Sequence, residues 1–265
     1  PLRHNPEQAA QLSDAAAAPA AGAGAPSVFS AEVADPVRAV TARDAMAPQT
    51  PGGKRRSPST GVEEAAAEWE EMFAGGKMPY TEAPFLSVQE VIRQHAPPGP
   101  QLAVDVGAGS GRGARWLVRE LESRRVVAVE PTASGCEHLQ VIAESLAPQS
   151  LAVVRATAQG FDWGSVAGQA DLVLFDSVLS FIPEHERPGV IAGALGALRP
   201  GTGVAVFTSH PDEADPDWVC ALLEADSVKV DIVERNRLAP FTMEWEGEKL
   251  EAAFAVVVAR ARPPG

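Results

Sequence analysis

The most constraining feature of this sequence is a short apolar run that passes through three glycines into a helical pattern. Residues 102–105 read Leu-Ala-Val-Asp and predict a short buried strand, Gly107, Gly109 and Gly111 follow, and residues 112–121 predict a helix. Such a junction presents bare backbone N–H groups and the positive end of a helix at the carboxyl edge of a sheet. Because glycine alone permits close approach and readily takes positive φ, the junction predicts a ligand-binding turn.

Strands and helices alternate after this turn, which predicts a doubly wound, seven-stranded, mostly parallel α/β sheet. Expected strands cover residues 102–106, 125–129, 151–155, 171–175 and 204–208. Expected helices cover residues 112–122, 133–147, 185–198 and 215–225. The last two expected strands, 228–234 and 252–259, are joined by a polar connection through Trp245 and Gly247. They can therefore close the sheet as a C-terminal antiparallel hairpin.

The N-terminal residues 1–60 differ in composition from the remainder. They are rich in Ala, Pro, Gly and Ser and hold a single aromatic residue, so they predict a largely disordered leader. We expect the ordered domain to cover residues 61–265, opening with cap helices within 61–98. One helix is expected at 62–73, and another starts at Thr81 or Glu82 with Pro84 in its first turn.

Charge and composition narrow the partners. The formal net charge is −13, and residues 61–265 hold 16 basic and 30 acidic side chains, which argues against nucleic acid. No apolar run reaches the roughly 18 residues that a membrane span needs.

The two cysteines, Cys136 and Cys220, are far apart, which favours a reducing, cytoplasmic location. A cleaved organelle-targeting leader stays open from the Ala, Ser and Arg content, although five acidic residues in it argue against that. No Cys/His cluster predicts a metal site.

Asp105 decides between two classes of nucleotide-binding turn. Residues 109–114 also fit the dinucleotide fingerprint G-x-G-x-x-G/A, which leaves an NAD(P)-dependent oxidoreductase as an alternative. An acid and a further glycine, Gly107, precede that fingerprint. A carboxylate there suits a ligand with an ammonium group better than a pyrophosphate, which it would repel. The plainer alternative is that Asp105 only caps the turn.

Glu130 ends the second expected strand. An acid at this place can accept both hydroxyls of a ribose, a feature that NAD enzymes share, so it indicates a nucleoside-type ligand. The alternative is a surface carboxylate at a strand end.

Over about residues 62–260, the chain resembles the class I methyltransferases that use S-adenosylmethionine. Residues 104–111 match the family's motif I almost fully, and Val129-Glu130 matches the acid that follows the second strand. Residues 172–179 are similar to motif IV, and residues 198–203 to the turn before the fifth strand. The resemblance implies S-adenosylmethionine as cofactor. It implies these cofactor-binding residues: Asp105, Gly107, Ala108, Gly109, Gly111, Glu130, Pro131, Thr157, Ala158, Gln159 and Asp176.

One departure from the family follows the third strand. The family often has an acid followed by Ala, which holds the adenine ring, and this chain has Ala156-Thr-Ala-Gln159. Thr157 stands in the place of the acid and can accept one hydrogen bond, and Ala158 would offer its backbone N–H.

The acceptor side is expected at the switch point between the first and fourth strands. There the resemblance places Asp176, Ser177 and Phe181 near the methyl group, with Tyr80 from the cap helices. Asp176 would contact the methionine ammonium or the substrate, or else only cap the next helix. Tyr80 would line the substrate pocket or pack in the core.

A general base helps only if the acceptor must lose a proton, since methyl transfer is mainly an alignment of donor and nucleophile. His210, after the fifth strand, is the first candidate base and His185 the second. A solvated loop histidine is the alternative for each.

The sequence thus predicts a metal-independent S-adenosylmethionine methyltransferase acting on oxygen, carbon or carboxyl of a small molecule. The alternatives are an oxidoreductase, which Asp105 disfavours, and a non-catalytic methyltransferase-like binding module, which Thr157 and the unassigned base leave open. The oligomeric state is left open.

Overall fold

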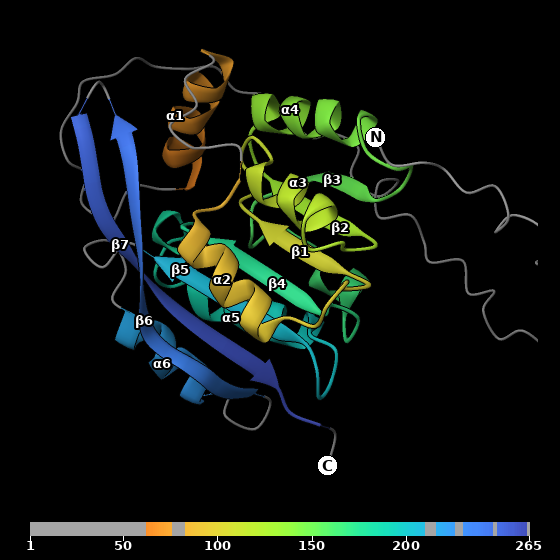
Figure 1. Ribbon diagram of the computed structural model, residues 1–265, viewed down its shortest axis with the longest axis vertical. Coiled ribbons are helices and arrows are strands. Elements are labelled where there is room, and N and C mark those ends of the chain that lie inside the picture. Colours follow the sequence, from red (N-terminus) through yellow and green to blue (C-terminus); the bar gives the residue numbers. More distant parts are fainter. Residues whose placement is uncertain (1–61, 76–82, 210–215, 226–229, 246–247, 264–265) are drawn as a thin grey trace, which may run out of the picture. The chain divides into compact units, whose positions relative to one another are not determined.

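The computed structural model describes residues 62–75, 83–209, 216–225, 230–245 and 248–263. The described residues form one seven-stranded sheet in the order β3-β2-β1-β4-β5-β7-β6 (Figure 1). The parallel strands are β1 (Ala103–Val106), β2 (Val126–Glu130), β3 (Leu151–Arg155), β4 (Leu172–Asp176) and β5 (Val204–Ser209). The antiparallel hairpin consists of β6 (Val230–Trp245) and β7 (Glu248–Ala261). This order confirms the predicted fold class.

Helices cover both faces of the sheet. One face carries α2 (Leu86–His95), α3 (Arg112–Arg119) and α4 (Ala133–Glu144). The opposite face carries α5 (Arg187–Ala197), α6 (Pro216–Ala225) and the short 3-10 turn η3 (Trp163–Val166). Helix α1 (Val62–Ala74) contacts α4, and a second 3-10 turn, η4 (Leu179–Phe181), follows β4. Since the central parallel strands β1, β2, β4 and β5 are buried on both faces, their sequences are apolar almost throughout.

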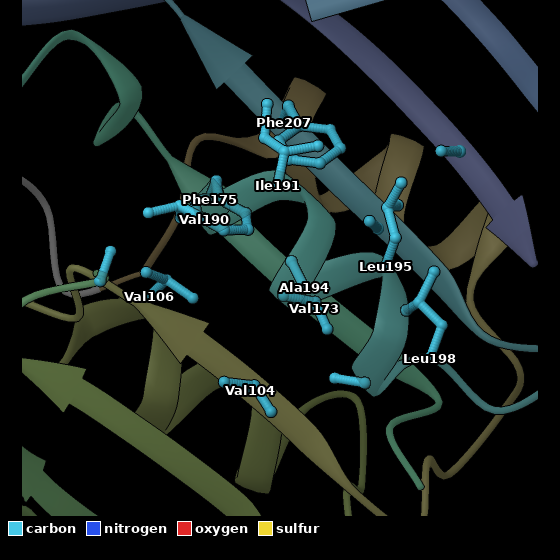
Figure 2. Close-up of a cluster of buried hydrophobic side chains, with 14 of the residues drawn as sticks. Val104, Val106, Val173, Phe175, Val190, Ile191, Ala194, Leu195, Leu198 and Phe207 are labelled. Atoms are coloured by element: carbon cyan, nitrogen blue, oxygen red, sulfur yellow. The ribbon is translucent and has the colours of Figure 1, made fainter. Parts of the chain in front are cut away.

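The core beneath α5 shows how the strands are held in place (Figure 2). Val190, Ile191 and Ala194 of α5 belong to the same buried cluster as Val173 and Phe175 of β4. These five side chains are at most 2% exposed, so the carboxyl end of β4 rests on a close-packed base.

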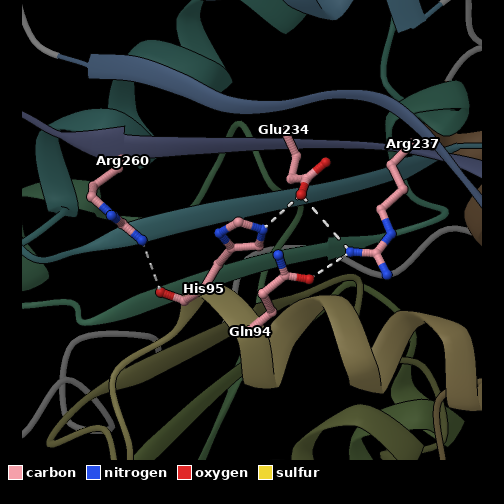
Figure 3. A network of polar contacts seen from close by, with 5 residues as sticks. All are labelled: Gln94, His95, Glu234, Arg237 and Arg260. Atoms are coloured by element: carbon pink, nitrogen blue, oxygen red, sulfur yellow. Dashed lines mark hydrogen bonds and ion pairs between the residues drawn. The ribbon is translucent and has the colours of Figure 1, made fainter.

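A polar network joins α2 to the hairpin (Figure 3). His95 Nε2 lies 3.2 Å from Glu234 Oε1, and Arg237 Nη1 donates to Gln94 Oε1 at 2.7 Å. The Arg260 guanidinium reaches the backbone oxygen of His95 at 3.5 Å. These contacts hold the carboxyl-terminal turn of α2 against β6 and β7.

The element boundaries differ most from the sequence prediction at the second helix and at the hairpin. The second helix begins at Leu86, so Pro84 precedes it instead of lying in its first turn, and Gln89 donates to the Pro84 oxygen at 2.7 Å. The hairpin strands are much longer than expected, and Trp245 lies in β6 instead of in a connection. Register shifts on both sides of Glu234 interrupt the two-residue period with which side chains alternate along β6. Polar residues and Pro240 are tolerated in β6 because it is an edge strand.

No helix among the described residues combines the length and the apolar character that crossing a membrane requires. The expected leader, residues 1–60, lies outside the described residues.

Candidate functional site

A cavity opens at the carboxyl ends of β1, β2 and β4, on the side where α1 lies. Its walls come from α1, the glycine turn, the end of β2 and the segments that follow β3 and β4. Its empty space is about 1030 Å³, a value that includes the open mouth, so the site is an open cleft at the ends of these strands. The site therefore lies at the switch point that the strand order predicts.

The glycine turn has the predicted left-handed backbone. The φ angles of Gly107, Gly109 and Gly111 are 67°, 54° and 91°. A Cβ on Gly107 would lie 2.4 Å from Cγ2 of Val178, so this position is closed to any side chain. The backbone N–H of Gly107 donates to the Val129 oxygen at 2.8 Å, which fixes the turn against β2.

Asp105 ends up buried below this turn. It is 2% exposed, lines the cavity, and its Oδ2 has no hydrogen-bond partner among the described residues. Burial raises the pKa of Asp105 to about 7, with Asp176 acting in the same direction and Arg112 against it. The absent side chain of Gly113 makes room for the carboxylate, since a Cβ there would lie 2.7 Å from Oδ2. A buried carboxylate oxygen without a donor fits a ligand that brings one.

Glu130 is also buried, at 4% exposed, so it is not a surface carboxylate. Its Oε2 accepts the Gly109 N–H at 2.8 Å, and its Oε1 accepts the Thr132 N–H at 2.9 Å and the Thr132 hydroxyl at 2.6 Å. Burial raises the pKa of Glu130 and outweighs these hydrogen bonds, which lower it. The carboxylate thereby joins the glycine turn to the start of α4 and still lines the cavity.

Asp176 is held by two protein donors. Arg112 Nη2 lies 2.6 Å from its Oδ2, and the Thr208 hydroxyl donates to its Oδ1 at 2.7 Å. Sequence reasoning did not include Arg112 in the site, although it lines the cavity. Arg112 could have been identified from the sequence, because the helix dipole disfavours a cation in the first turn of a helix.

Ser177 has strained backbone. Its φ is 60°, which is uncommon for a residue with a side chain and concentrates at functional sites. Its backbone N–H donates to the Thr208 hydroxyl at 3.0 Å, while its own hydroxyl is buried and finds no hydrogen-bond partner in the described part of the chain.

Thr157, Ala158 and Gln159, which follow β3, line the cavity, and so does Pro131 after β2; their contact with a cofactor stays a prediction. The Thr157 hydroxyl accepts the Gly160 N–H at 3.1 Å, so it is already part of a local turn.

Helix α1 supplies an aromatic wall to the cavity. The Trp69 ring lies 5.5 Å from Phe73 and 5.7 Å, edge to face, from Phe181. Ala66 lines the cavity beside them. Phe73 packs on the glycine turn, since a Cβ on Gly109 would lie 3.2 Å from its Cζ.

Of the two candidate bases, only His185 lies within the described residues, and it does not line this cavity. The His185 side chain is 81% exposed, lies 3.7 Å from Glu186, and is not part of the cavity wall. His210 and Tyr80 lie outside the described residues. Among the described residues, no group of three or more His, Cys, Asp or Glu side chains is placed to hold a metal ion.

Comparisons with known proteins agree with this geometry. Residues 103–201 match a family model described as a methyltransferase domain. None of the curated proteins shows significant sequence similarity to the chain. The chain thus has the predicted seven-stranded class I methyltransferase fold, and residues 103–201 are similar to the methyltransferase domain family.

Three solved structures share the fold at low sequence identity. The YcgJ protein of Bacillus subtilis is 11% identical, covering 68% of this chain and 99% of its own, with a TM-score of 0.52. A SAM-dependent methyltransferase of Leishmania major is 16% identical, with coverages of 77% and 85% and a TM-score of 0.55. The [4+2]-cyclase SpnF is 12% identical, with coverages of 77% and 97% and a TM-score of 0.56. At these identities the likeness establishes the fold alone.

Proposed function

We propose that this chain binds S-adenosylmethionine in the cavity and transfers its methyl group to a small-molecule acceptor. The observation that carries the proposal is the buried Asp105 carboxylate, whose Oδ2 lacks a donor at the wall of the cavity. An ammonium group supplies that donor and a favourable charge, whereas a pyrophosphate would meet a buried negative charge. The matched methyltransferase domain supports the same cofactor.

The surrounding residues fit the other parts of this ligand. Glu130 can accept ribose hydroxyls with the lone pairs that Gly109 and Thr132 leave, and Ala158 can present its backbone N–H to an adenine ring. The glycine turn, with Gly107 at positive φ, lines the cavity beside them. When bound, S-adenosylmethionine supplies an electrophilic methyl group.

The chain's own contribution to the reaction is alignment and exclusion of water. Ser177 and Phe181 line the acceptor side, where the buried Ser177 hydroxyl can hydrogen-bond an incoming acceptor. Trp69 and Phe181 form an apolar edge that keeps water from the reacting atoms. We retain oxygen, carbon and carboxyl acceptors, with His210 as first candidate base and His185 as second.

We infer that the reaction is metal-independent and that the acceptor is not a nucleic acid. Asp176, the acid after β4, is engaged by Arg112 and Thr208, and is therefore poorly placed to serve as a metal ligand. The net charge of −13 would repel a phosphate backbone. Cys136 and Cys220 are buried and are not joined in a disulfide, in accord with a reducing, cytoplasmic compartment.

Calorimetric titration tests the proposal. S-adenosylhomocysteine and NADH are titrated side by side into the wild-type chain at pH 8, with Asp105→Asn as the matched variant. We expect binding of S-adenosylhomocysteine only, and at least about tenfold weaker binding by the variant, because a charge-assisted hydrogen bond is lost. Binding of NADH alone would overturn the proposal. Methyl-transfer assays with an acceptor panel then separate an enzyme from a binding module.

A further inference from the structure

Three charged side chains meet where β1 and β4 end: Asp105, Asp176 and Arg112. Asp105 is 2% exposed, and the side chains of Arg112 and Asp176 are 12% and 10% exposed. Water screens charges poorly at such burial. The ion pairing among these three side chains therefore determines which of the two carboxyl groups is ionised.

The two carboxylates are occupied unequally. Asp176 has a donor on each oxygen, Arg112 on Oδ2 and the Thr208 hydroxyl on Oδ1. Asp105 has no donor on Oδ2 within the described part of the chain. Both line the same cavity, but only Asp105 has an oxygen whose hydrogen bonding is incomplete.

Arg112 is held toward Asp176 by its surroundings. Its guanidinium carbon lies 5.2 Å from the centre of the Phe85 ring, which precedes α2. A cation in the first turn of α3 opposes the helix dipole, so helix stability alone does not favour an arginine here. Its position is instead explained by the carboxylates at the ends of the neighbouring strands.

We propose that Arg112 is a positioning residue for the amino-acid end of the cofactor: by pairing with Asp176, it keeps Asp105 ionised and open to the ammonium group. This inference rests on the proposed function. It assigns the ammonium to Asp105, and it assigns to Asp176 the separate task of holding Arg112.

Every charged group that acts on Asp105 fits this arrangement. Burial, Asp176 on β4 and, to a lesser extent, Glu130 on β2 all raise the pKa of Asp105, whose net value is about 7. Arg112 and the backbone N–H of Ala114, both on α3, act in the opposite direction. Without the Arg112 charge, less Asp105 would be ionised at neutral pH.

The test measures binding of S-adenosylhomocysteine by calorimetry from pH 6 to pH 8.5. Wild type is compared with Arg112→Gln, Arg112→Lys and the control Arg119→Gln, which removes a charge from the exposed end of the same helix. The ligand's own amine titrates identically in every titration, so the ratio of variant to wild-type Kd reports only on the protein.

For Arg112→Gln we expect a Kd ratio of about tenfold at pH 6 that falls to about twofold or less at pH 8.5, as for a pKa raised by about one unit. Arg112→Lys restores the charge and returns the ratio toward one, and Arg119→Gln gives a ratio near one throughout. A ratio for Arg112→Gln that does not change with pH indicates a purely structural role and overturns the inference.

The variant Asp176→Asn should change the affinity for S-adenosylhomocysteine in the opposite direction. It tests the inference even if Arg112→Gln does not fold. Removal of the neighbouring negative charge favours ionised Asp105, so binding at pH 6 becomes tighter than in wild type. If Asp176 itself held the ammonium, Asp176→Asn would weaken binding at every pH, and the inference would be wrong. Wild-type chain that binds no S-adenosylhomocysteine at any pH refutes the proposed function itself, which is a distinguishable result.

Discussion

Glu70 on α1 caps the first turn of α4 through Ser134. Its carboxylate accepts the Ser134 backbone N–H at 3.1 Å and also the Ser134 hydroxyl, and it accepts the Ala133 N–H at 2.6 Å. A negative charge at a helix N-terminus satisfies donors that have no partner within the helix and interacts favourably with the dipole. This contact ties α1, and with it Trp69, to the fixed part of the cavity.

The first prediction concerns this cap. Glu70→Ala should lower the free energy of unfolding by about 1 kcal/mol, as loss of a helix cap does, and should weaken binding of S-adenosylhomocysteine because α1 forms one wall of the cavity. Urea unfolding and hydrogen exchange of α1 measure the two effects. Glu71→Ala, on the exposed side of the same helix, is the matched control.

The same cap has a defined pH dependence. Burial acts to raise the pKa of Glu70, but hydrogen bonds from Ser134 and Ala133 outweigh it, so the pKa lies below its usual value. When the pKa of a carboxyl group is lowered in the folded state, the resulting stabilisation is fully present above the ordinary carboxyl pKa. This stabilisation is lost as the pH falls through the folded-state pKa. The stability gap between wild type and Glu70→Ala should therefore close on acidification, and a gap that widens would contradict the account.

The second prediction uses two glycines with the same backbone angle. Gly107 and Gly168 both have φ of 67°, but a Cβ on Gly107 meets Val178 at 2.4 Å, while nothing lies within 4 Å of a Cβ on Gly168. Gly168→Ala should lower the free energy of unfolding by about 1–2 kcal/mol because of its positive φ alone. Gly107→Ala should lower it by about 1–3 kcal/mol more because of the clash. Denaturant unfolding measures both. Val178→Ala in the Gly107→Ala background should recover part of the difference, and equal costs at the two glycines would show that the clash is relieved elsewhere.

The third prediction follows from the raised pKa of Asp105, about 7. The folded chain binds an extra proton between the ordinary carboxyl pKa and about 7, so stability falls with rising pH across that window. Asp105→Asn removes this loss. Its stability advantage over wild type should therefore grow between pH 4.5 and pH 7, by up to about 1.4 kcal/mol per pH unit, and then level off. Thermal unfolding across this range measures it, and an advantage that does not vary with pH would contradict the buried carboxylate.

The fourth prediction concerns Glu130. In Glu130→Gln one oxygen becomes an NH₂ group, which cannot accept the N–H of Gly109 or of Thr132, so the start of α4 and the glycine turn lose a shared anchor. The free energy of unfolding should fall by about 1–2 kcal/mol. The exposed Glu137→Gln on α4 is the control. We expect the effect of Asp105→Asn on cofactor binding to exceed this effect of Glu130→Gln on stability; unchanged stability in Glu130→Gln would mean that its contacts are weak.

The parallel half of the fold could be predicted because its strands are apolar on both faces and each is followed by a helix or turn signal. The glycine turn and Glu130 were predictable for the same local reason, since each lies at the carboxyl end of a strand. The full length of β6 was not, because the irregular register around Glu234 breaks the two-residue period on which strand prediction depends.

The contacts that complete the site could not be read from the sequence. Glu70 and Ser134 are 64 positions apart, and a glutamate on the polar side of an amphipathic helix is usually solvated. The contact of Asp176 with the ammonium or the substrate stays a prediction. Its pairing with Arg112 and Thr208 was not predictable, because it depends on the register of β4 and β5. Arg112 alone carried a signal, as a cation at a helix start.

The most direct test of the central claim is the crystal structure of the full chain with S-adenosylhomocysteine. Our account predicts the ligand's amino group against Oδ2 of Asp105, its ribose against Glu130 and its sulfur facing the Ser177 side of the cavity. A complex with the nucleoside bound elsewhere, or with the Asp105 carboxylate turned away from the ligand, would contradict it.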